Sequence, residues 1–454
     1  MSCSSRHPCV RLSTRISLCF VTLIALGTAP FNSWGAVPEY VTSDAPPPTS
    51  AVSSEGLLGN AFAKSSAGQV SGALRELWRD SSLVLRPRSY FFDRDREVGD
   101  NDQAWALGGS LEFVSGWWRN KLRFSSTLYT SQKLSADDET DTTKLLQTDQ
   151  DGITAFGQAY VEAKLTEDIH ARAGRTALNL PYVNKNDSRM VPITHEAYGL
   201  GGNWNQNTKF GIVHVRKQKP VNNEEFISMS EAAGAAGSND PLTLIGMRYS
   251  PNMSWNVGAT NQYAWNVMNT FYAEANASWA LTNDVAISTS AQYTGQESTG
   301  DELIGRFDTY VYGARISASY RDAVLSLATS STDENSQIRN PFGGYPGYLS
   351  LMISDFDKAG EDAWLIGFSY DFATAGIPGL STFVNYAQGN TPDSGPLASP
   401  DQTETDITVD YRFKAKTLDG LWLRLRWGQL DQSGIGADDI TDTRIILNYE
   451  VALF

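Results

Sequence analysis

The stretch Leu421-Trp422-Leu423-Arg424-Leu425-Arg426-Trp427 places leucines on one face of an extended chain and Arg424 and Arg426 on the other. Residues 405–416 before it and 443–454 after it alternate in the same way. Ile407, Val409, Tyr411 and Phe413 share a face in the first, and Ile445, Leu447, Tyr449, Val451 and Leu453 in the second. A period of two is the signature of β-strands that lie between two different environments. Here one environment accepts apolar groups, and the other accepts paired cations.

The two faces predict an all-β protein, a transmembrane antiparallel up-and-down β-barrel with lipid outside and a charged, water-filled lumen inside. Alternation yields about 18 candidate strands, an even number that this class of barrel permits. They are residues 83–92, 103–114, 121–131, 154–165, 169–176, 197–204, 208–217, 242–250, 255–263, 269–281, 285–294, 308–320, 324–331, 363–372, 380–389, 405–416, 421–430 and 443–454.

The connections between these strands alternate in length. Tight polar turns are expected at 166–168, 205–207, 251–254, 282–284, 321–322 and 417–420, and long polar loops at 135–152, 177–196, 218–241, 295–307, 331–362 and 390–404. Single-chain outer-membrane barrels sort their connections in this way, with short periplasmic turns and long external loops. The acidic segments 93–102, 137–151, 222–225 and 439–442 are interpreted as solvated loops.

Residues 1–36 have the layout of a secretory signal peptide for export through the Sec pathway. Three arginines precede the apolar run 16–29, and small residues follow it. Cleavage is expected near Gly35 or Ala36, with Ala29 as the alternative. Residues 37–80 then form a periplasmic N-terminal extension and residues 81–454 the barrel. All three cysteines lie in the leader, so the exported chain must fold without disulfides.

The balance of charge argues against a nucleic-acid partner. The chain carries a formal net charge of -15, whereas proteins that bind nucleic acid present a basic surface to the phosphates. Together with the leader and the strand pattern, the composition predicts a protein of the Gram-negative outer membrane.

Basic side chains follow the polar faces of the closing strands, and these faces predict a path for anions. Arg412, Lys414, Arg424, Arg426 and Arg444 share them, closure of the barrel adds Arg86 and Arg88, and Arg248 and Arg315 occupy polar faces elsewhere. An arginine in lipid at mid-depth costs roughly 2–4 kcal/mol, so these side chains should point inward. A row of guanidinium groups offers a carboxylate successive bidentate partners. The alternative is a solvated wall whose cations only pair with Asp406, Asp410 and Glu450.

Three motifs resemble the OprD family of substrate-specific outer-membrane porins of pseudomonads and their relatives. Asp80-Ser81-Ser82-Leu83 with Arg88-Ser89-Tyr90-Phe91-Phe92-Asp93-Arg94-Asp95 is similar to the family's opening strand. A second motif resembles the inward-folded third loop of the family: Gly174-Arg175 with Asn179-Leu180-Pro181, Asp187-Ser188-Arg189 and Pro192. The long seventh loop is resembled by Asn340-Pro341-Phe342-Gly343-Gly344 with Pro346-Gly347-Tyr348, Asp355-Phe356 and Lys358-Ala359-Gly360-Glu361.

The resemblance implies a porin through which small anionic or zwitterionic solutes that contain a carboxylate, such as aromatic or organic acids or amino acids, diffuse passively. It also implies a monomer or loose trimer, surrounded by outer-membrane lipids and lipopolysaccharide and inserted by the barrel-assembly machinery. The constriction is expected from Asn179, Pro181, Asp187, Ser188, Arg189, Phe342, Gly343, Gly344, Tyr345 and Tyr348. Asn385 stands where several relatives place an arginine, and Tyr345 where members that recognise basic amino acids often have an acid. Asn385 thus removes one rung of the ladder of basic residues, and Tyr345 weakens the case for a cationic solute. The family's other branch takes small, often aromatic, carboxylates, and the resemblance favours these.

Two other classes of function remain open: an outer-membrane hydrolase on a β-barrel scaffold, and a soluble carbohydrate-binding β-protein. After the leader the chain has only His170, His195 and His214, and His195-Glu196 lacks the second histidine of an HExxH zinc site. No cofactor, metal site or catalytic residue is expected. A soluble protein would leave the sorting of loops by length without a reason.

The last residue departs from the alternation of the closing strand. Phe454 is out of phase with Val451 and Leu453. Either a β-bulge near Glu450 or a tolerant assembly machinery would accommodate it.

Overall fold

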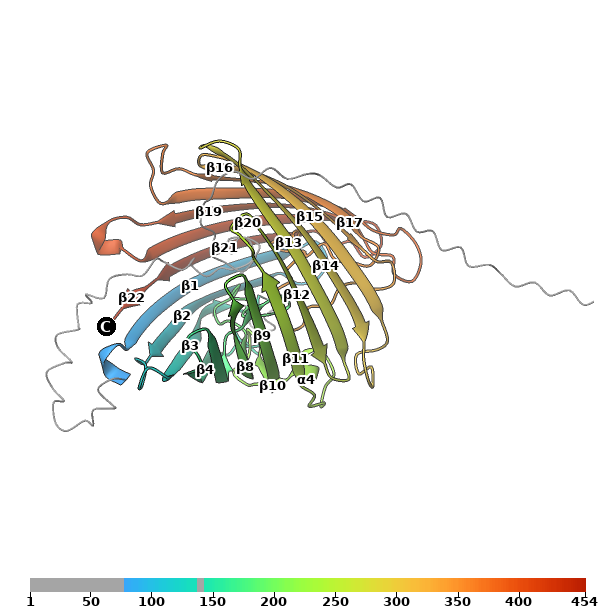
Figure 1. Ribbon diagram of the computed structural model, residues 1–454. Helices are drawn as coiled ribbons and strands as arrows, with labels where there is room; N and C mark the ends of the chain where they lie inside the picture. Colours follow the sequence, from blue (N-terminus) through green and yellow to red (C-terminus); the bar gives the residue numbers. More distant parts are fainter. Residues whose placement is uncertain (1–76, 137–142) are drawn as a thin grey trace, which may run out of the picture.

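The computed structural model describes residues 77–136 and 143–454 (Figure 1). The expected signal peptide, residues 1–36, and almost all of the expected extension, residues 37–80, lie outside the described residues. Among the residues that are described, no helix has the length and apolar character needed to cross a bilayer.

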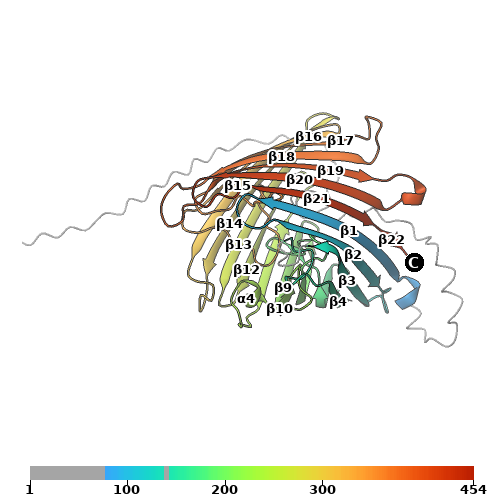
Figure 2. The ribbon, with the colours of Figure 1, turned by 180° about the vertical axis from the view of Figure 1, so that it is seen from behind.

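Within the described residues, antiparallel strands form one sheet that closes on itself into a barrel (Figures 1 and 2). Of its 20 strands, β10 (Ile227–Ser228) and β22 (Val451–Ala452) are two-residue pieces, which leaves eighteen wall strands. In chain order these are β1 (Ser82–Arg96), β2 (Asp102–Val114), β3 (Leu122–Ala136), β4 (Ile153–Lys164), β5 (Ile169–Thr176), β8 (Thr194–Asn205), β9 (Thr208–Lys219), β11 (Leu242–Tyr249), β12 (Trp255–Ala264), β13 (Met268–Ala280), β14 (Val285–Ser298), β15 (Asp308–Tyr320), β16 (Ala323–Thr332), β17 (Asp362–Asp371), β18 (Leu380–Asn390), β19 (Asp401–Arg412), β20 (Leu421–Ser433) and β21 (Ile440–Tyr449).

Each wall strand pairs with its neighbours along the chain, and β1 pairs with β21 and β22 to close the barrel. The predicted fold class and strand number are therefore confirmed. The remaining elements are short and lie in the connections: β6 (Asn179–Leu180), β7 (Val183–Asn184), the helix α4 (Met229–Ala232) and the 3₁₀ turn η1 (Lys416–Leu418).

The wall has the two faces that the alternation predicts. On β20, Leu425 faces outward and is 42% exposed, whereas its neighbours Arg424 and Arg426 face the lumen and are 0% and 4% exposed. Exposed apolar side chains recur around the barrel, as with Ile245 on β11 and Leu327 on β16. A protein with its apolar side chains on the outer surface and its arginines inside is suited to a lipid environment.

The closing seam stays in one register from Asn448 to Ala452, with Leu85 opposite Val451, so no β-bulge lies at Glu450 itself. The pairing becomes irregular at the last two residues. The N–H of Leu453 donates to the carbonyl of Leu83 at 2.8 Å, whereas the N–H of Leu83 donates to the carbonyl of Phe454 at 3.0 Å. Two residues thus face one residue of β1, as at a β-bulge.

The strand that carries the wall acids begins and ends earlier than expected. β19 runs from Asp401 to Arg412 rather than over 405–416. The N–H of Phe413 then donates to the carbonyl of Leu421 at 3.0 Å, and the chain turns through η1. Lys414 therefore lies beyond the end of β19 and is exposed, so its assignment to a strand was wrong.

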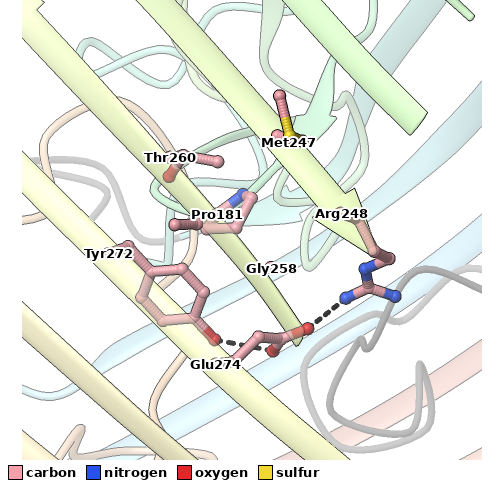
Figure 3. Close-up of a pocket in the computed structure, with 8 residues that line it drawn as sticks. Pro181, Met247, Arg248, Gly258, Thr260, Tyr272 and Glu274 are labelled. Carbon is pink, nitrogen blue, oxygen red and sulfur yellow. Dashed lines mark hydrogen bonds and ion pairs between the residues drawn. The ribbon is translucent and has the colours of Figure 1, made fainter. Parts of the chain in front are cut away.

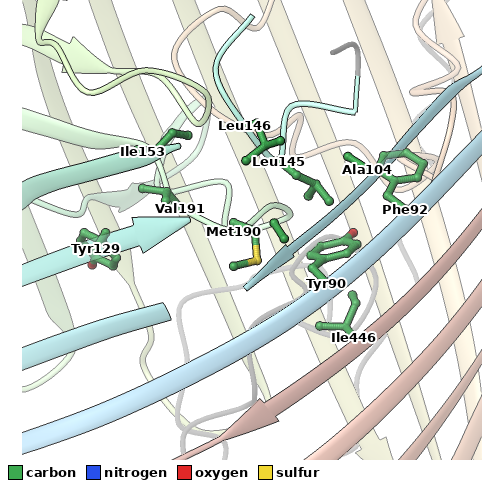
Figure 4. Packing of buried hydrophobic residues seen from close by; sticks show 11 residues of the cluster. Tyr90, Phe92, Ala104, Tyr129, Leu145, Leu146, Ile153, Met190, Val191 and Ile446 are labelled. Atoms are coloured by element: carbon green, nitrogen blue, oxygen red, sulfur yellow. The ribbon is translucent and has the colours of Figure 1, made fainter. Parts of the chain in front are cut away.

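Three of the long loops fold into the barrel: loop 143–152, loop 177–193 and loop 333–361. The first was interpreted as solvated, which is wrong for Leu145 and Leu146, although Asp149 and Asp151 are exposed. Leu145 and Leu146 are fully buried against Tyr90 and Phe92 of β1, in a cluster completed by Ala104, Ala106, Tyr129, Ile153, Met190, Val191 and Ile446 (Figure 4). Burial of apolar surface inside the bore therefore holds this loop against the wall.

Replacing both leucines, Leu145→Ser and Leu146→Ser, should release loop 143–152 from the bore. Large-to-small changes at buried leucines each cost about 2–5 kcal/mol, whereas the hydrogen bonds of the barrel wall are untouched. We expect a higher single-channel conductance in a planar bilayer and an unchanged folded band on an unboiled gel. Leu397→Ser, at an exposed position in the loop after β18, is the matched control; equal conductance of the two variants would contradict the packing role.

Candidate functional site

The lumen faces of four adjacent strands, β19, β20, β21 and β1, carry a group of arginines that we term the arginine wall. Its members are Arg86, Arg88, Arg412, Arg424, Arg426 and Arg444. Strand register brings Arg426 directly opposite Arg444 and Arg88 opposite Asn448. Arg94 extends the wall along β1; it was missed, although it is in phase with Arg86 and Arg88. Like charges that lie opposite each other on neighbouring strands destabilise a sheet unless acids separate them.

Acids are interleaved with the arginines along this wall. The Arg424 Nε and Nη2 donate to the two carboxylate oxygens of Asp410 at 2.7 and 2.8 Å. Asp442 accepts from Arg94 at 2.6 and 2.7 Å and from Arg444 at 2.7 Å. Asp442 is fully buried, so the interpretation of 439–442 as a solvated loop is also wrong. The bidentate pairs fix the guanidinium planes of the wall.

Loop 333–361 covers the part of the wall nearest the long loops. The backbone N–H groups of Met352, Ile353 and Ser354 donate to Asp406 and Glu404 at 3.0, 2.8 and 2.8 Å, and the carbonyl of Met352 accepts from Arg444 at 2.9 Å. The loop thus supplies main-chain partners to buried charges of both signs. Arg424, Arg426 and Arg444 are all buried, and Arg444 contacts this loop directly.

Nearer the periplasmic end, the wall is more accessible. Arg86 lies between Glu112 and Glu450, with a contact of 2.6 Å to each carboxylate, and its side chain is 35% exposed. The Arg88 Nε donates to the Asn448 Oδ1 at 2.8 Å, and its Nη1 contacts the Asp187 Oδ1 at 3.0 Å. Asp187 belongs to loop 177–193, not to the wall, so an inward loop provides this carboxylate.

Loop 177–193 reaches across the bore from one side of the barrel to the other. On the side of β1, the carbonyl of Arg189 accepts from Arg88, the carbonyl of Ser188 accepts from the hydroxyl of Tyr90, and the Arg189 Nε donates to the carbonyl of Thr143. On the far side, the hydroxyl of Tyr182 donates to Thr294 of β14 at 2.8 Å, and Gln262 of β12 donates to the carbonyl of Pro181. Asn179, at its start, pairs with Asn184 in the small β6–β7 ladder.

The two inward loops meet in the bore. The Asn184 Nδ2 donates to the carbonyl of Gly344 at 2.9 Å, and the N–H of Gly344 donates back to the Asn184 Oδ1 at 2.8 Å. A Cβ at Gly343 would lie 2.7 Å from the backbone nitrogen of Asn184, so glycine is required for this approach. Phe342 is buried beside them in an apolar cluster with Val183. Of the expected constriction residues, Phe342, Gly343 and Gly344 thus meet loop 177–193, at Asn184 and Val183.

Tyr345 lies away from any open passage. It is 4% exposed and packs edge-on against Tyr182, which packs in turn against Tyr272 of β13. Burial raises the pKa of Tyr345 well above its usual range. The residue type at this position therefore acts through loop packing, and the sequence could not distinguish that role from a direct contact with solute.

Arg248 and Arg315 lie across the barrel from the arginine wall. Arg248 of β11 forms an ion pair with Glu274 of β13, which also accepts from the hydroxyl of Tyr272 at 2.8 Å (Figure 3). Pro181 of loop 177–193 closes a cavity of about 20 Å³ beside them, the size of a single water. The guanidinium of Arg315 stacks on Tyr348 of loop 333–361 at 4.6 Å. Arg315 therefore contacts an inward loop, whereas Arg248 is paired within the wall. Among the described residues no His, Cys, Asp and Glu side chains are grouped so as to hold a metal ion.

Removing one member of the buried Arg424–Asp410 pair should be costly. Arg424→Met leaves an unpaired carboxylate, and we expect a loss of about 3–5 kcal/mol in the free energy of unfolding, largely restored in the double variant Arg424→Met with Asp410→Leu. Denaturant unfolding of the purified barrel measures both. The control is Arg321→Met, which removes an exposed turn pair with Asp284 worth about 1 kcal/mol or less. Equal effects of the two single changes would contradict the account.

The carboxyl groups of loop 333–361 make its attachment sensitive to pH. Burial, followed by the charges of Asp355 and Glu361, raises the pKa of Asp357 well above its usual range, and burial also raises the pKa of Asp355. The folded loop therefore favours the protonated forms. Their stabilising contribution is present at acid pH and is lost as the pH rises through the raised pKa values.

We expect backbone amides of loop 333–361 to exchange faster at about pH 8 than at about pH 5 after correction for the intrinsic rates, and Asp357→Asn to reduce that difference. Mass spectrometry of hydrogen exchange checks this. Asp393→Asn, at an exposed site in the loop after β18, is the control. Stronger protection at the higher pH would overturn the sign of the effect.

Comparison with known proteins agrees with this geometry. The family model for outer membrane porins of the OprD family matches residues 75–453. The porin-like protein GalP of Pseudomonas putida is 22% identical over 390 residues, which cover 82% of this chain and 92% of the relative. Crystal structures of Pseudomonas aeruginosa OccK9 (OpdG) and of OpdK with vanillate superpose with TM-scores of 0.76 and 0.74, at 21% and 18% identity, over 83% of this chain and 100% of each. Since the family match spans the whole barrel, this chain belongs to the OprD family of outer-membrane porins.

Proposed function

We propose that this porin gives selective passive diffusion to small solutes that carry a carboxylate, which move along the accessible part of the arginine wall. The observation that carries the proposal is the contact between Arg88 and Asp187, at 3.0 Å. A wall guanidinium binds a carboxylate that a loop delivers, and both side chains retain some exposure, at 9% and 16%. A carboxylate from solution has the same chemistry and can take the place of Asp187.

Exchange of one carboxylate for another explains how such a site can bind and still release. The Arg88 Nε is already held by Asn448, so the guanidinium is oriented before the solute arrives. When the solute leaves, Asp187 pairs with Arg88 again, so the charge of the Arg88 guanidinium is always balanced by a carboxylate. Conduction requires binding of this weak, reversible kind. Arg86, which contacts both Glu112 and Glu450, is the next guanidinium toward the periplasm to which the solute binds.

Three further features support a carboxylate over a cationic solute. The wall acids Asp410 and Asp442 are already paired with arginines, so they are poor partners for an incoming ammonium group. Tyr345 carries no charge at neutral pH and is buried. The solved relative OpdK was crystallised with vanillate, an aromatic carboxylate. The relatives that match the chain are porins, which favours a channel over the hydrolase alternative.

Paired substitutions at the Arg88–Asp187 contact test this proposal. Arg88→Gln should weaken block of the current by benzoate about tenfold or more, because a hydrogen bond to a charged group contributes about 1.5–3 kcal/mol. Asp187→Asn removes the internal competitor, so benzoate should block the channel more strongly. Recording from single channels in a planar bilayer measures both effects.

The matched control is Arg306→Gln, at a highly exposed loop position, which should leave block by benzoate unchanged. Arginine and an uncharged sugar serve as comparison solutes. Block of equal strength by the sugar, or effects of Arg88→Gln and Asp187→Asn that have the same sign, would defeat the proposal.

A further inference from the structure

Cations on the outer surface of the barrel wall are confined to one place. Along the described strands, every arginine and lysine is in the lumen-facing phase except on β5 and β9, the two neighbours of β8. The exceptions are Arg175, Arg216, Lys217 and Lys219. An outward cation costs roughly 2–4 kcal/mol at mid-depth and little near the interface. Four such residues at one site, and none elsewhere on the described wall, therefore require a local reason.

Strand register and a β-bulge assemble these side chains. Arg175 lies opposite Glu196 on β8, and Glu196 lies opposite Lys217 on β9. The register shifts between Glu196 and Ala197, so both Arg216 and Lys217 face Glu196. A bulge of this kind puts two consecutive side chains on one face of a strand. The result is a row of three cations around one acid, which we term the outer basic patch: Arg175, Arg216, Lys217 and Glu196.

The cations of the outer basic patch are incompletely neutralised. The Arg216 side chain is 52% exposed, and its nearest acid contact is to Glu196 at 3.9 Å. Arg175 is exposed and stacks on Phe226 at 4.4 Å. Behind the patch, the ammonium of Lys219 is buried and donates to the main-chain carbonyls of Pro220 and Asn223 at 2.7 and 3.4 Å. Two acids border the patch; Glu224 is engaged by the N–H of Thr154, and Glu225 is exposed.

The patch lies at the level of the outer-leaflet headgroups. β8 runs from the long-loop end to the short-turn end, and Trp204, packed edge-on against Phe210, marks its periplasmic end. Eight residues separate Glu196 from Trp204, which at about 3.3 Å per residue and a tilt of about 40° span about 20 Å of the bilayer. That distance approaches the height of the apolar band of such barrels, about 25 Å. The long cationic side chains can extend further toward the headgroups.

We propose that the outer basic patch binds a phosphate group of a phosphorylated glycolipid in the outer leaflet. The planar guanidinium groups of Arg175 and Arg216 suit bidentate contacts to phosphate, and Lys217 adds a point charge. Below them, the stacked rings of Tyr198 and His214 present a flat surface at the depth of the sugar and first acyl carbons. The ligand is a lipid rather than a free ion because the site faces the bilayer.

The test uses the purified barrel in nanodiscs of phosphatidylcholine, with bis-phosphorylated lipid A as the probe and native mass spectrometry as the readout. The wild-type protein should retain one lipid A, and dephosphorylated lipid A should bind at least about tenfold more weakly. The triple variant Arg175→Gln, Arg216→Gln and Lys217→Gln should lose affinity by about the same factor. Glu196→Gln, which removes the one acid of the patch, should bind as tightly as the wild type or more tightly.

Arg306→Gln is the charge-matched control and should bind lipid A as the wild type does. If the triple variant fails to give a folded band on an unboiled gel, Arg216→Gln alone carries the test, with an expected loss of about threefold. Equal retention of lipid A by the wild type and the variants overturns the proposal. So does displacement of the lipid by millimolar inorganic phosphate, or a change confined to the oligomeric state, which would indicate a second copy of the chain as the occupant.

Discussion

The rest of the structure depends on one constraint: a guanidinium group cannot face the hydrocarbon core of a bilayer at mid-depth without a large cost. In strands, where successive side chains point to opposite faces, this constraint drives the arginines of β1, β19, β20 and β21 into the lumen. Once inside they repel each other, as Arg426 and Arg444 lie directly opposite. Acids such as Asp410 and Asp442 are then needed between them, and the wall becomes a network of ion pairs.

The inward loops follow from the same network. Buried carboxylates such as Asp406 and Glu404 need hydrogen-bond donors, and the backbone of loop 333–361 provides them. Loop 177–193 supplies Asp187 to Arg88 and joins the other loop through Asn184. The bore is thus narrowed by segments that the charges of the wall hold in place. The Arg88–Asp187 pair, with side chains 9% and 16% exposed, is less deeply buried than the Arg424–Asp410 pair, at 1% and 6%; we propose that solutes exchange at the former.

The barrel wall could be predicted from the sequence because the alternation of side chains along a strand depends only on neighbouring residues. A period of two located β5 at its observed bounds and placed Arg424, Arg426 and Arg444 on the correct face. The same pattern misled beyond the end of a strand, as at Lys414, because side chains there need not alternate between two faces. It also gave no sign that Leu145 and Leu146 would be buried, since their partners Tyr90 and Phe92 are distant in the chain. The pairing of Arg88 with Asp187, 99 residues apart, depends on how a loop folds, which alternation does not describe.

A high-resolution structure with bound benzoate would show whether a solute carboxylate replaces Asp187. We expect the benzoate carboxylate within hydrogen-bond distance of the Arg88 guanidinium and the Asp187 carboxylate displaced from its present contact of 3.0 Å. Benzoate bound elsewhere in the bore, with the Arg88–Asp187 pair intact, would contradict it.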